Sequence, residues 1–149
     1  MPDTPEADPA ETILAFDFGL RRIGVAIGQN ITGSASPLGI VGNDDSGPDH
    51  ARIGRLLDEW RPARLVVGMP AHTDGSPSEM QVPVNAFIEE LTRYGLPIDV
   101  VDERYTSIEA KAVLKKARAA GTRGRLSREM IDSAAAVFIA ERYLASQRR

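Results

Sequence analysis

Three acidic residues lie where apolar side chains are expected, and together they indicate metal chemistry. Asp17 ends the apolar run of residues 13–16, Glu103 follows the apolar segment 98–101, and Asp132 lies on the apolar stripe of the last predicted helix. Burying an ionised carboxylate is costly unless it is paired or bound to a metal. Mg²⁺ and Mn²⁺ bind carboxylate oxygens, and such ions stabilise the attacking and leaving oxygens of phosphodiester hydrolysis. The three acids therefore predict a site for Mg²⁺ or Mn²⁺ and nuclease chemistry.

Each acid also has a simpler interpretation, which the sequence leaves open. An Asp at a strand end can satisfy a turn, and Glu103 or its neighbour Asp102 can be an ordinary loop acid. Asp132 can complement the helix dipole from the first turn. However, the residues three, four and seven positions after Asp132 are alanine, alanine and isoleucine. This stripe implies that Asp132 points inward, which a dipole role does not require.

A basic stretch suggests a nucleic-acid partner in spite of the formal net charge of −3. Between Glu109 and Glu129 there are seven basic residues and no acid, so the rest of the chain carries −3 − 7 = −10. A basic patch on an acidic protein can hold a phosphate backbone, although a solvated helix face followed by a basic loop has the same composition. The predicted phosphate contacts are Arg21, Arg22, Arg104, Lys115, Lys116, Arg123 and Arg125.

Two further features near these residues carry less information. Arg21 and Arg22 follow Asp17 in a short turn and can also be solvated turn residues. His72 lies in a polar loop at 70–77 that could cover the site, although a single loop histidine is usually inert. Aromatic residues make up only 5% of the chain, so recognition through the backbone and shape is expected rather than extensive base stacking.

Length and composition predict one soluble domain. The chain has 149 residues, 42% hydrophobic and 26% charged, and no cysteine, which excludes disulfides and thiolate metal sites. Residues 1–10 are acidic and proline-rich, unlike a signal peptide, and predict a disordered tail before a single domain at 11–149. No apolar run approaches the roughly 20 residues that span a bilayer. We therefore expect a cytoplasmic protein.

Hydrophobic periodicity predicts a mixed sheet of five strands with helices on both faces. The element order is β-β-β-α-β-α-β-α-α, which is the order of the ribonuclease H-like fold, but a fold alone does not give a function. Thr106 and Glu109 form a capping box, and Ser127 is an N-cap. The expected strands are 11–18, 22–29, 36–41, 64–69 and 97–102, and the expected helices are 49–60, 79–94, 106–120 and 127–145.

Four segments, in order along nearly the whole folded chain, resemble motifs of the YqgF family of pre-16S rRNA nucleases. These proteins are also called RuvX or Holliday junction resolvase-like proteins. The segments are DFG at 17–19 with RIGVA at 22–26, VVGMP at 66–70 with Gly75, DERYTSIEA at 102–110, and IDSAAA at 131–136. The resemblance implies a ribonuclease H-like fold and a divalent-metal nuclease that matures the 5′ end of 16S ribosomal RNA. It also implies that Asp17, Glu103 and Asp132 are the acidic site.

One departure and three alternatives accompany this resemblance. Related nucleases often carry a fourth carboxylate one turn along the last helix, where this chain has Ala135 or Ala136, so the site holds one tight metal unless Asp102 or substrate completes a second. A Holliday junction resolvase would act on branched DNA as a homodimer, whereas an RNA nuclease can be a monomer. A nucleic-acid-binding protein without catalysis is a second alternative. A sugar-kinase-like phosphotransferase is the third, and the chain is too short for its two domains.

Overall fold

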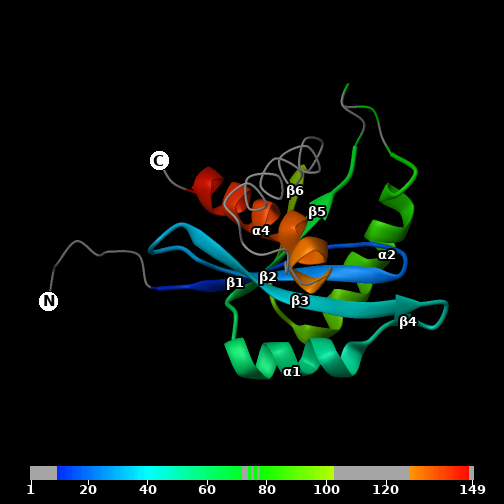
Figure 1. Ribbon diagram of the computed structural model, residues 1–149, viewed down its shortest axis with the longest axis horizontal. Coiled ribbons are helices and arrows are strands. Elements are labelled where there is room, and N and C mark those ends of the chain that lie inside the picture. Colours follow the sequence, from blue (N-terminus) through cyan, green and yellow to red (C-terminus); the bar gives the residue numbers. More distant parts are fainter. Residues whose placement is uncertain (1–9, 72–73, 75, 77, 103–127, 148–149) are drawn as a thin grey trace, which may run out of the picture.

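The computed structural model describes residues 10–71, 74, 76, 78–102 and 128–147, and it leaves out the side chains of residues 128–132. Within these ranges one six-stranded sheet has the order β4-β3-β2-β1-β5-β6 and is flanked by helices (Figure 1). The strands are β1 (Thr12–Asp17), β2 (Arg22–Gln29), β3 (Ser34–Asp44), β4 (Gly47–Pro48), β5 (Arg64–Met69) and β6 (Ile98–Asp102). The helices are α1 (His50–Trp60), α2 (Gln81–Leu91), the short 3₁₀ helix η1 (Thr92–Tyr94) and α4 (Arg128–Gln147).

The sheet is mixed, as the sequence predicts. Strands β1, β2 and β3 form an antiparallel meander, with Asp17 opposite Gly24. Strand β5 pairs in parallel with β1 and also with β6. The structure adds a sixth strand to the five predicted, because the backbone of Gly47 has a φ of 107° and turns the chain back beside β3. A glycine tolerates this conformation, and its neighbourhood in the sequence is typical of a loop.

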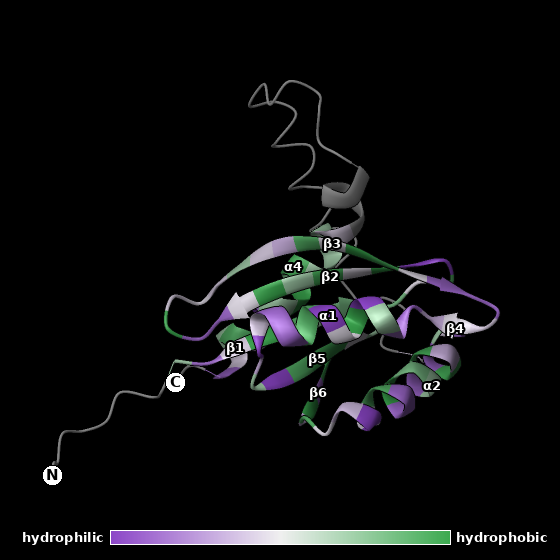
Figure 2. Cartoon of the chain, turned by 90° about the horizontal axis from the view of Figure 1, so that it is seen from below, coloured by the Kyte–Doolittle hydropathy of each residue, from purple (hydrophilic) through white to green (hydrophobic). Residues whose placement is uncertain are grey.

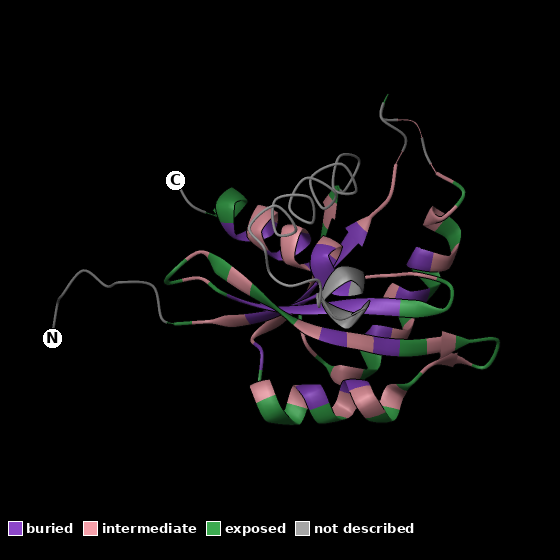
Figure 3. Ribbon diagram, viewed as in Figure 1, coloured by how far each residue is buried: buried purple, intermediate pink, exposed green. Residues whose placement is uncertain are grey.

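The alternation of β1 divides the core into two layers (Figure 3). Leu14 and Phe16 are fully buried in the cluster that α1 and α2 cover. Ile13 and Ala15 are buried in a second cluster, against α4. In Figure 2 the apolar stretches of the central strands lie between α1 and α4, which occupy opposite faces of the sheet. The predicted arrangement, with helices on both faces, is therefore confirmed.

The helices agree with the expected positions to within a few residues. Helix α1 begins after Asp49, whose carboxylate accepts a hydrogen bond from the backbone N–H of Arg52. Helix α2 spans 81–91 rather than the predicted 79–94, because its last turn tightens into the 3₁₀ helix η1. Residues 1–9 of the tail predicted at 1–10 lie outside the described residues, as do the helix predicted at 106–120 with its capping box and the Ser127 cap. None of the described helices is long and apolar enough to cross a membrane.

Helix α4 runs antiparallel to β1. Leu144, near its C-terminal end, packs beside Ile13 at the start of β1, and a Cβ atom at Gly28 would lie 3.1 Å from the Leu144 side chain. Tyr143 contacts Asp99 near the start of β6. The C-terminal end of α4 therefore lies over the strand starts, and its N-terminal end is directed toward the end of β1, as Figure 1 shows.

Candidate functional site

The carboxyl ends of three parallel strands meet at one edge of the sheet. Phe16 of β1 is level with Val67 of β5, and Met69 is level with Asp102 of β6. Strand β1 ends at Asp17 and β6 ends at Asp102, so two of the acids named from the sequence end strands at this edge. This is the edge at which ligands bind in open sheets of parallel strands.

Asp17 lies on the face of the sheet that α4 covers. It follows Ile13 and Ala15 at a spacing of two residues, and both of these pack against α4. Its side chain is half-buried at the end of an otherwise buried strand. The alternation inferred from the sequence is therefore confirmed for β1, and it places this carboxylate at the boundary between core and solvent.

The dimensions of α4 and β1 bring Asp132 to the same end of the molecule. From Tyr143 back to Asp132 is 11 residues of helix, about 16 Å at 1.5 Å per residue. From Ile13 to Asp17 is four residues of strand, about 13 Å. Because the two elements run antiparallel from a common contact, the backbone position of Asp132 is directed toward the end of β1 that carries Asp17. The Asp132 side chain lies outside the described residues.

Strand β6 ends at Asp102, and its alternation gives the face of each of its residues. Asp99 accepts a hydrogen bond from Tyr143 of α4, and Val101 packs against the cluster beneath α4. Asp102 is exposed and follows Val101 directly, so the strand's alternation directs it away from the α4 face. Glu103 is the next residue and lies outside the described part of the chain.

The turn after Asp17 is tightly held. A Cβ atom at Gly19 would collide with the carbonyl oxygen of Arg22, so this position requires glycine. The Asn43 side chain donates a hydrogen bond of 2.8 Å to the Gly19 carbonyl oxygen, and its backbone N–H donates one of 3.0 Å to that of Arg21. Asn43 is not among the residues named from the sequence, because a single asparagine within a predicted loop carries no signal of this role.

The predicted phosphate contacts are only partly described. Arg21 and Arg22 are exposed, at the turn that follows Asp17. The remaining predicted contacts, Arg104, Lys115, Lys116, Arg123 and Arg125, lie outside the described residues, as does His72. Among the residues that the structure describes, no three His, Asp or Glu side chains form a group able to hold a metal. Asp17 is the one predicted metal ligand whose side chain is described.

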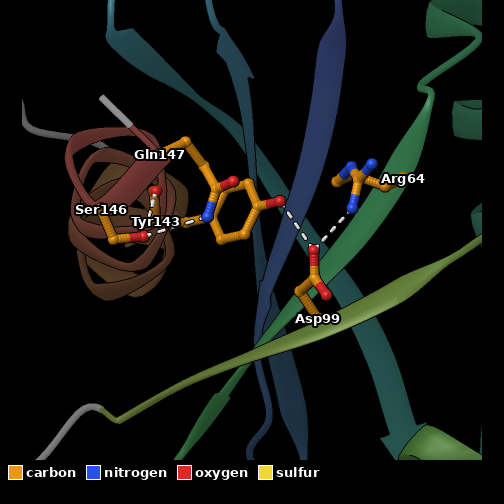
Figure 4. A network of polar contacts seen from close by, with 5 residues as sticks. All are labelled: Arg64, Asp99, Tyr143, Ser146 and Gln147. Atoms are coloured by element: carbon orange, nitrogen blue, oxygen red, sulfur yellow. Dashed lines mark hydrogen bonds and ion pairs between the residues drawn. The ribbon is translucent and has the colours of Figure 1, made fainter. Parts of the chain in front are cut away.

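A polar network at the opposite end of α4 fixes the helix on the sheet (Figure 4). Arg64 of β5 and the Tyr143 hydroxyl each donate a hydrogen bond of 2.7 Å to Oδ2 of Asp99. These bonds lower the pKa of Asp99, while burial and the bond to Asp99 raise the pKa of Tyr143 to about 12. The sequence places Asp99 only within a predicted strand, since nothing in the sequence pairs residues 64, 99 and 143.

The chain is similar to a known protein family over most of its length. The RuvX family model, described as Holliday junction resolvase, matches residues 11–146. A Burkholderia ambifaria protein named "Putative pre-16S rRNA nuclease" is 47% identical over 134 residues, covering 89% of this chain and 88% of that protein. A Paraburkholderia xenovorans protein of the same name is 45% identical, covering 89% of this chain and 87% of its own length.

Solved structures share the fold at low sequence identity. Thermus thermophilus RuvC in complex with a Holliday junction substrate has a TM-score of 0.54 and 14% identity, covering 92% of this chain and 95% of that one. Fowlpox virus resolvase, in complex with Holliday junction DNA, has a TM-score of 0.55 and 14% identity, covering 93% and 99%. These likenesses show a resolvase-like fold of the ribonuclease H type.

Proposed function

This chain belongs to the RuvX family, and on that premise we propose that it is a metal-dependent nuclease that hydrolyses phosphodiester bonds of precursor 16S ribosomal RNA at the 5′ end. The names of the similar Burkholderia and Paraburkholderia proteins support this substrate. One observation of the structure carries the proposal. Asp17 ends β1 half-buried, on the face toward which the N-terminal end of α4 is directed.

The proposed metal ligands are Asp17, Glu103 and Asp132. Three carboxylates offer only oxygen donors, which suits Mg²⁺ or Mn²⁺, and the chain has no cysteine for a softer metal. The alternation of β6 favours Glu103 over Asp102 as a metal ligand, because Asp99 and Val101 face α4 and Glu103 continues that spacing of two residues. When bound, the metal would activate water and stabilise the charge on the phosphate oxygens.

The other residues of the site would position the substrate. The Asn43 hydrogen bonds hold the turn after Asp17, so the carboxylate sits on a fixed strand end rather than a mobile loop. Arg21 and Arg22 would neutralise phosphates next to the scissile bond, with Arg104 and the basic stretch extending this surface. Such contacts give affinity and orientation without reading the sequence.

Resolution of DNA junctions is the second candidate function. The printed description of the family and the fold shared with RuvC and the fowlpox virus resolvase favour it. A resolvase must cut two strands symmetrically and would act as a homodimer. A chain that stays monomeric with a bound four-way junction would contradict this second candidate.

The test compares Asp17→Asn with the matched variant Asp58→Asn, which changes an exposed acid on α1. Labelled precursor RNA and junction DNA are incubated side by side with Mg²⁺ or Mn²⁺. We expect Asp17→Asn to abolish cleavage without lowering the melting temperature, because it removes a metal-binding charge and retains the shape of the side chain. Asp58→Asn should cleave like the wild type. Undiminished cleavage by Asp17→Asn would contradict the proposed site.

A further inference from the structure

A cavity opens beside the candidate active site, on the other face of the sheet. It has a volume of about 640 Å³ and lies between α2 and the β3–β4 hairpin. Its first lining residue along the chain is Phe18, which directly follows Asp17, and Leu20 and Arg21 of the same turn also line it. The cavity is therefore within one residue of the proposed metal ligand, around the edge of the sheet. Its volume is in the range of about 300–1,000 Å³ that is usual for small-ligand sites.

The walls of the cavity are fixed by contacts that the structure describes. Asn43 holds the turn that carries Leu20 and Arg21 through its two bonds to that turn. On the opposite wall, His50 binds Glu90 of α2 through Nε2 at 2.7 Å. A Cβ atom at Gly47 would lie 3.9 Å from both carboxylate oxygens of Glu90, so the hairpin closes against α2 at this point. The cavity is thus already formed without a ligand.

The lining combines three kinds of chemistry. The floor is aromatic, with the ring centroids of Phe18 and Phe87 5.1 Å apart. Leu20, which is 62% exposed, adds an aliphatic surface at the edge of the cavity. Arg21 is exposed, and within the described structure its guanidinium group forms no ion pair or hydrogen bond. The acceptors are carboxylates, supplied by Asp44, Asp45 and Glu90.

The carboxylates restrict what can enter the cavity. Ser46 donates two hydrogen bonds to Oδ1 of Asp44, from its backbone N–H and its hydroxyl, and these bonds lower the pKa of Asp44, so this acid stays ionised. A phosphate inside the cavity would meet three carboxylates, whereas a phosphate at its edge would meet Arg21. A flat group that carries N–H donors satisfies the floor and the carboxylates together. Carboxylates recognise the exocyclic amino group of a base in this way.

We propose that this cavity receives the base of one unpaired nucleotide next to the scissile phosphate, and that it favours bases with an exocyclic amino group over uracil. The base would pack against Phe18 and Leu20, its amino group would donate to Asp45, and Arg21 would bind its phosphate. This inference rests on the proposed nuclease function for the identity of the ligand. It goes beyond that function by giving the enzyme a preference at one nucleotide.

The experiment measures binding without cleavage. Fluorescently labelled hexanucleotides, all-uridine or with one adenosine or cytidine in a uridine background, are titrated with the full chain in EDTA, and anisotropy is recorded. Because the strand can slide, the single adenosine or cytidine can reach the cavity in any register. We expect the substituted strands to bind at least about fivefold more tightly than the all-uridine strand. Leu20→Ala and Asp45→Asn should each reduce this ratio toward one.

Two matched variants control for general effects. Ile31→Ala truncates another exposed aliphatic side chain, 58% exposed, in the β2–β3 hairpin, and Asp58→Asn removes an exposed acid of α1. Both should keep the wild-type ratio. The inference would be overturned if the wild type bound all strands equally or bound none of them. It would also be overturned if Leu20→Ala and Asp45→Asn left the affinity ratio unchanged. We expect that a tetra-arginine peptide displaces none of the strands. Peptide binding that requires Asp45 would instead assign the cavity to a basic protein partner.

The two proposals can fail separately. Discrimination between the strands, together with cleavage that persists in Asp17→Asn, would retain the base site and contradict the proposed active site. Cleavage that depends on Asp17, together with equal binding of all strands, would retain the active site and contradict the base site.

Discussion

At the scale of single residues, Asp99 joins three elements although it is not a predicted site residue. Asp99 accepts hydrogen bonds from Arg64 and Tyr143 through the same oxygen and thereby joins β5, β6 and α4. Asp17 is better explained by the sequence, because strand alternation alone gives its face. The Asp99 contacts depend on three distant segments, and only the folded chain shows that they meet.

Tyr143→Phe should lower the free energy of unfolding by about 1.5–3 kcal/mol at neutral pH, since it removes one hydrogen bond to a carboxylate. The pKa of Tyr143 rises from 10.0 to about 12 on folding, so the neutral phenol is favoured in the fold. Its contribution is complete below pH 10 and is lost as the pH rises through about 12. Urea unfolding of both proteins between pH 7 and 12 checks this.

The lowered pKa of Asp99 makes stability depend on pH in the opposite direction. Its carboxylate stabilises the fold above the ordinary value of 3.8, and this contribution is lost as the pH falls below that value. An Asp99→Asn background provides the control, because Tyr143→Phe should cost less there. An equal cost in both backgrounds would show that the tyrosine hydroxyl does not act through Asp99.

At the scale of elements, the sequence predicts the order and type of every described element except β4 and the end of α2. The apolar runs of β1, β2 and β5 and the periodicity of α1 carry strong local signals. Strand β4 has two residues and exists only because β3 lies beside it, so local patterns cannot find it. Local sequence patterns also do not predict the direction of α4, since it follows from packing against Ile13 and Gly28.

Two glycines test the packing of these elements. A Cβ atom at Gly28 would lie 3.1 Å from Leu144 and 3.2 Å from Ile13, whereas one at Gly54 would meet nothing within 4 Å. We expect Gly28→Ala to destabilise the chain, because the packed side chains of Leu144 and Ile13 must shift to admit the methyl group. Gly54→Ala, inside α1, should stabilise it by about 0.5–1 kcal/mol. Thermal unfolding of both variants measures this contrast, and equal melting temperatures would contradict the proposed docking of α4.

At the scale of the whole molecule, the charges are distributed unevenly. The net charge is −3, yet the segment between Glu109 and Glu129 carries +7. That segment lies within residues 11–146, which the RuvX family model matches. The proposed metal ligands also differ in what the structure describes. The face of Asp17 follows from the alternation of β1, whereas Glu103 and the Asp132 side chain lie outside the described residues.

Binding of single-stranded RNA should therefore depend strongly on salt. Each phosphate contact contributes a slope of about −0.7 to the plot of log K against log salt concentration. Replacing Lys115 and Lys116 by alanine should make the slope less steep by about 1.4, whereas replacing the exposed Arg93 near α2 should leave it unchanged. Anisotropy titrations at several salt concentrations give these slopes. Identical slopes in all three proteins would exclude the two lysines from the RNA surface.

The antiparallel packing of α4 on β1 also has a consequence for the order in which the protein is made. The two elements lie more than a hundred residues apart in the sequence, so β1 leaves the ribosome long before α4 does. Until then Ile13, Ala15 and Val66 lack the helix that buries them, and an emerging chain exposes this apolar face. The nascent protein is thus a candidate client for chaperones until synthesis has passed the last helix.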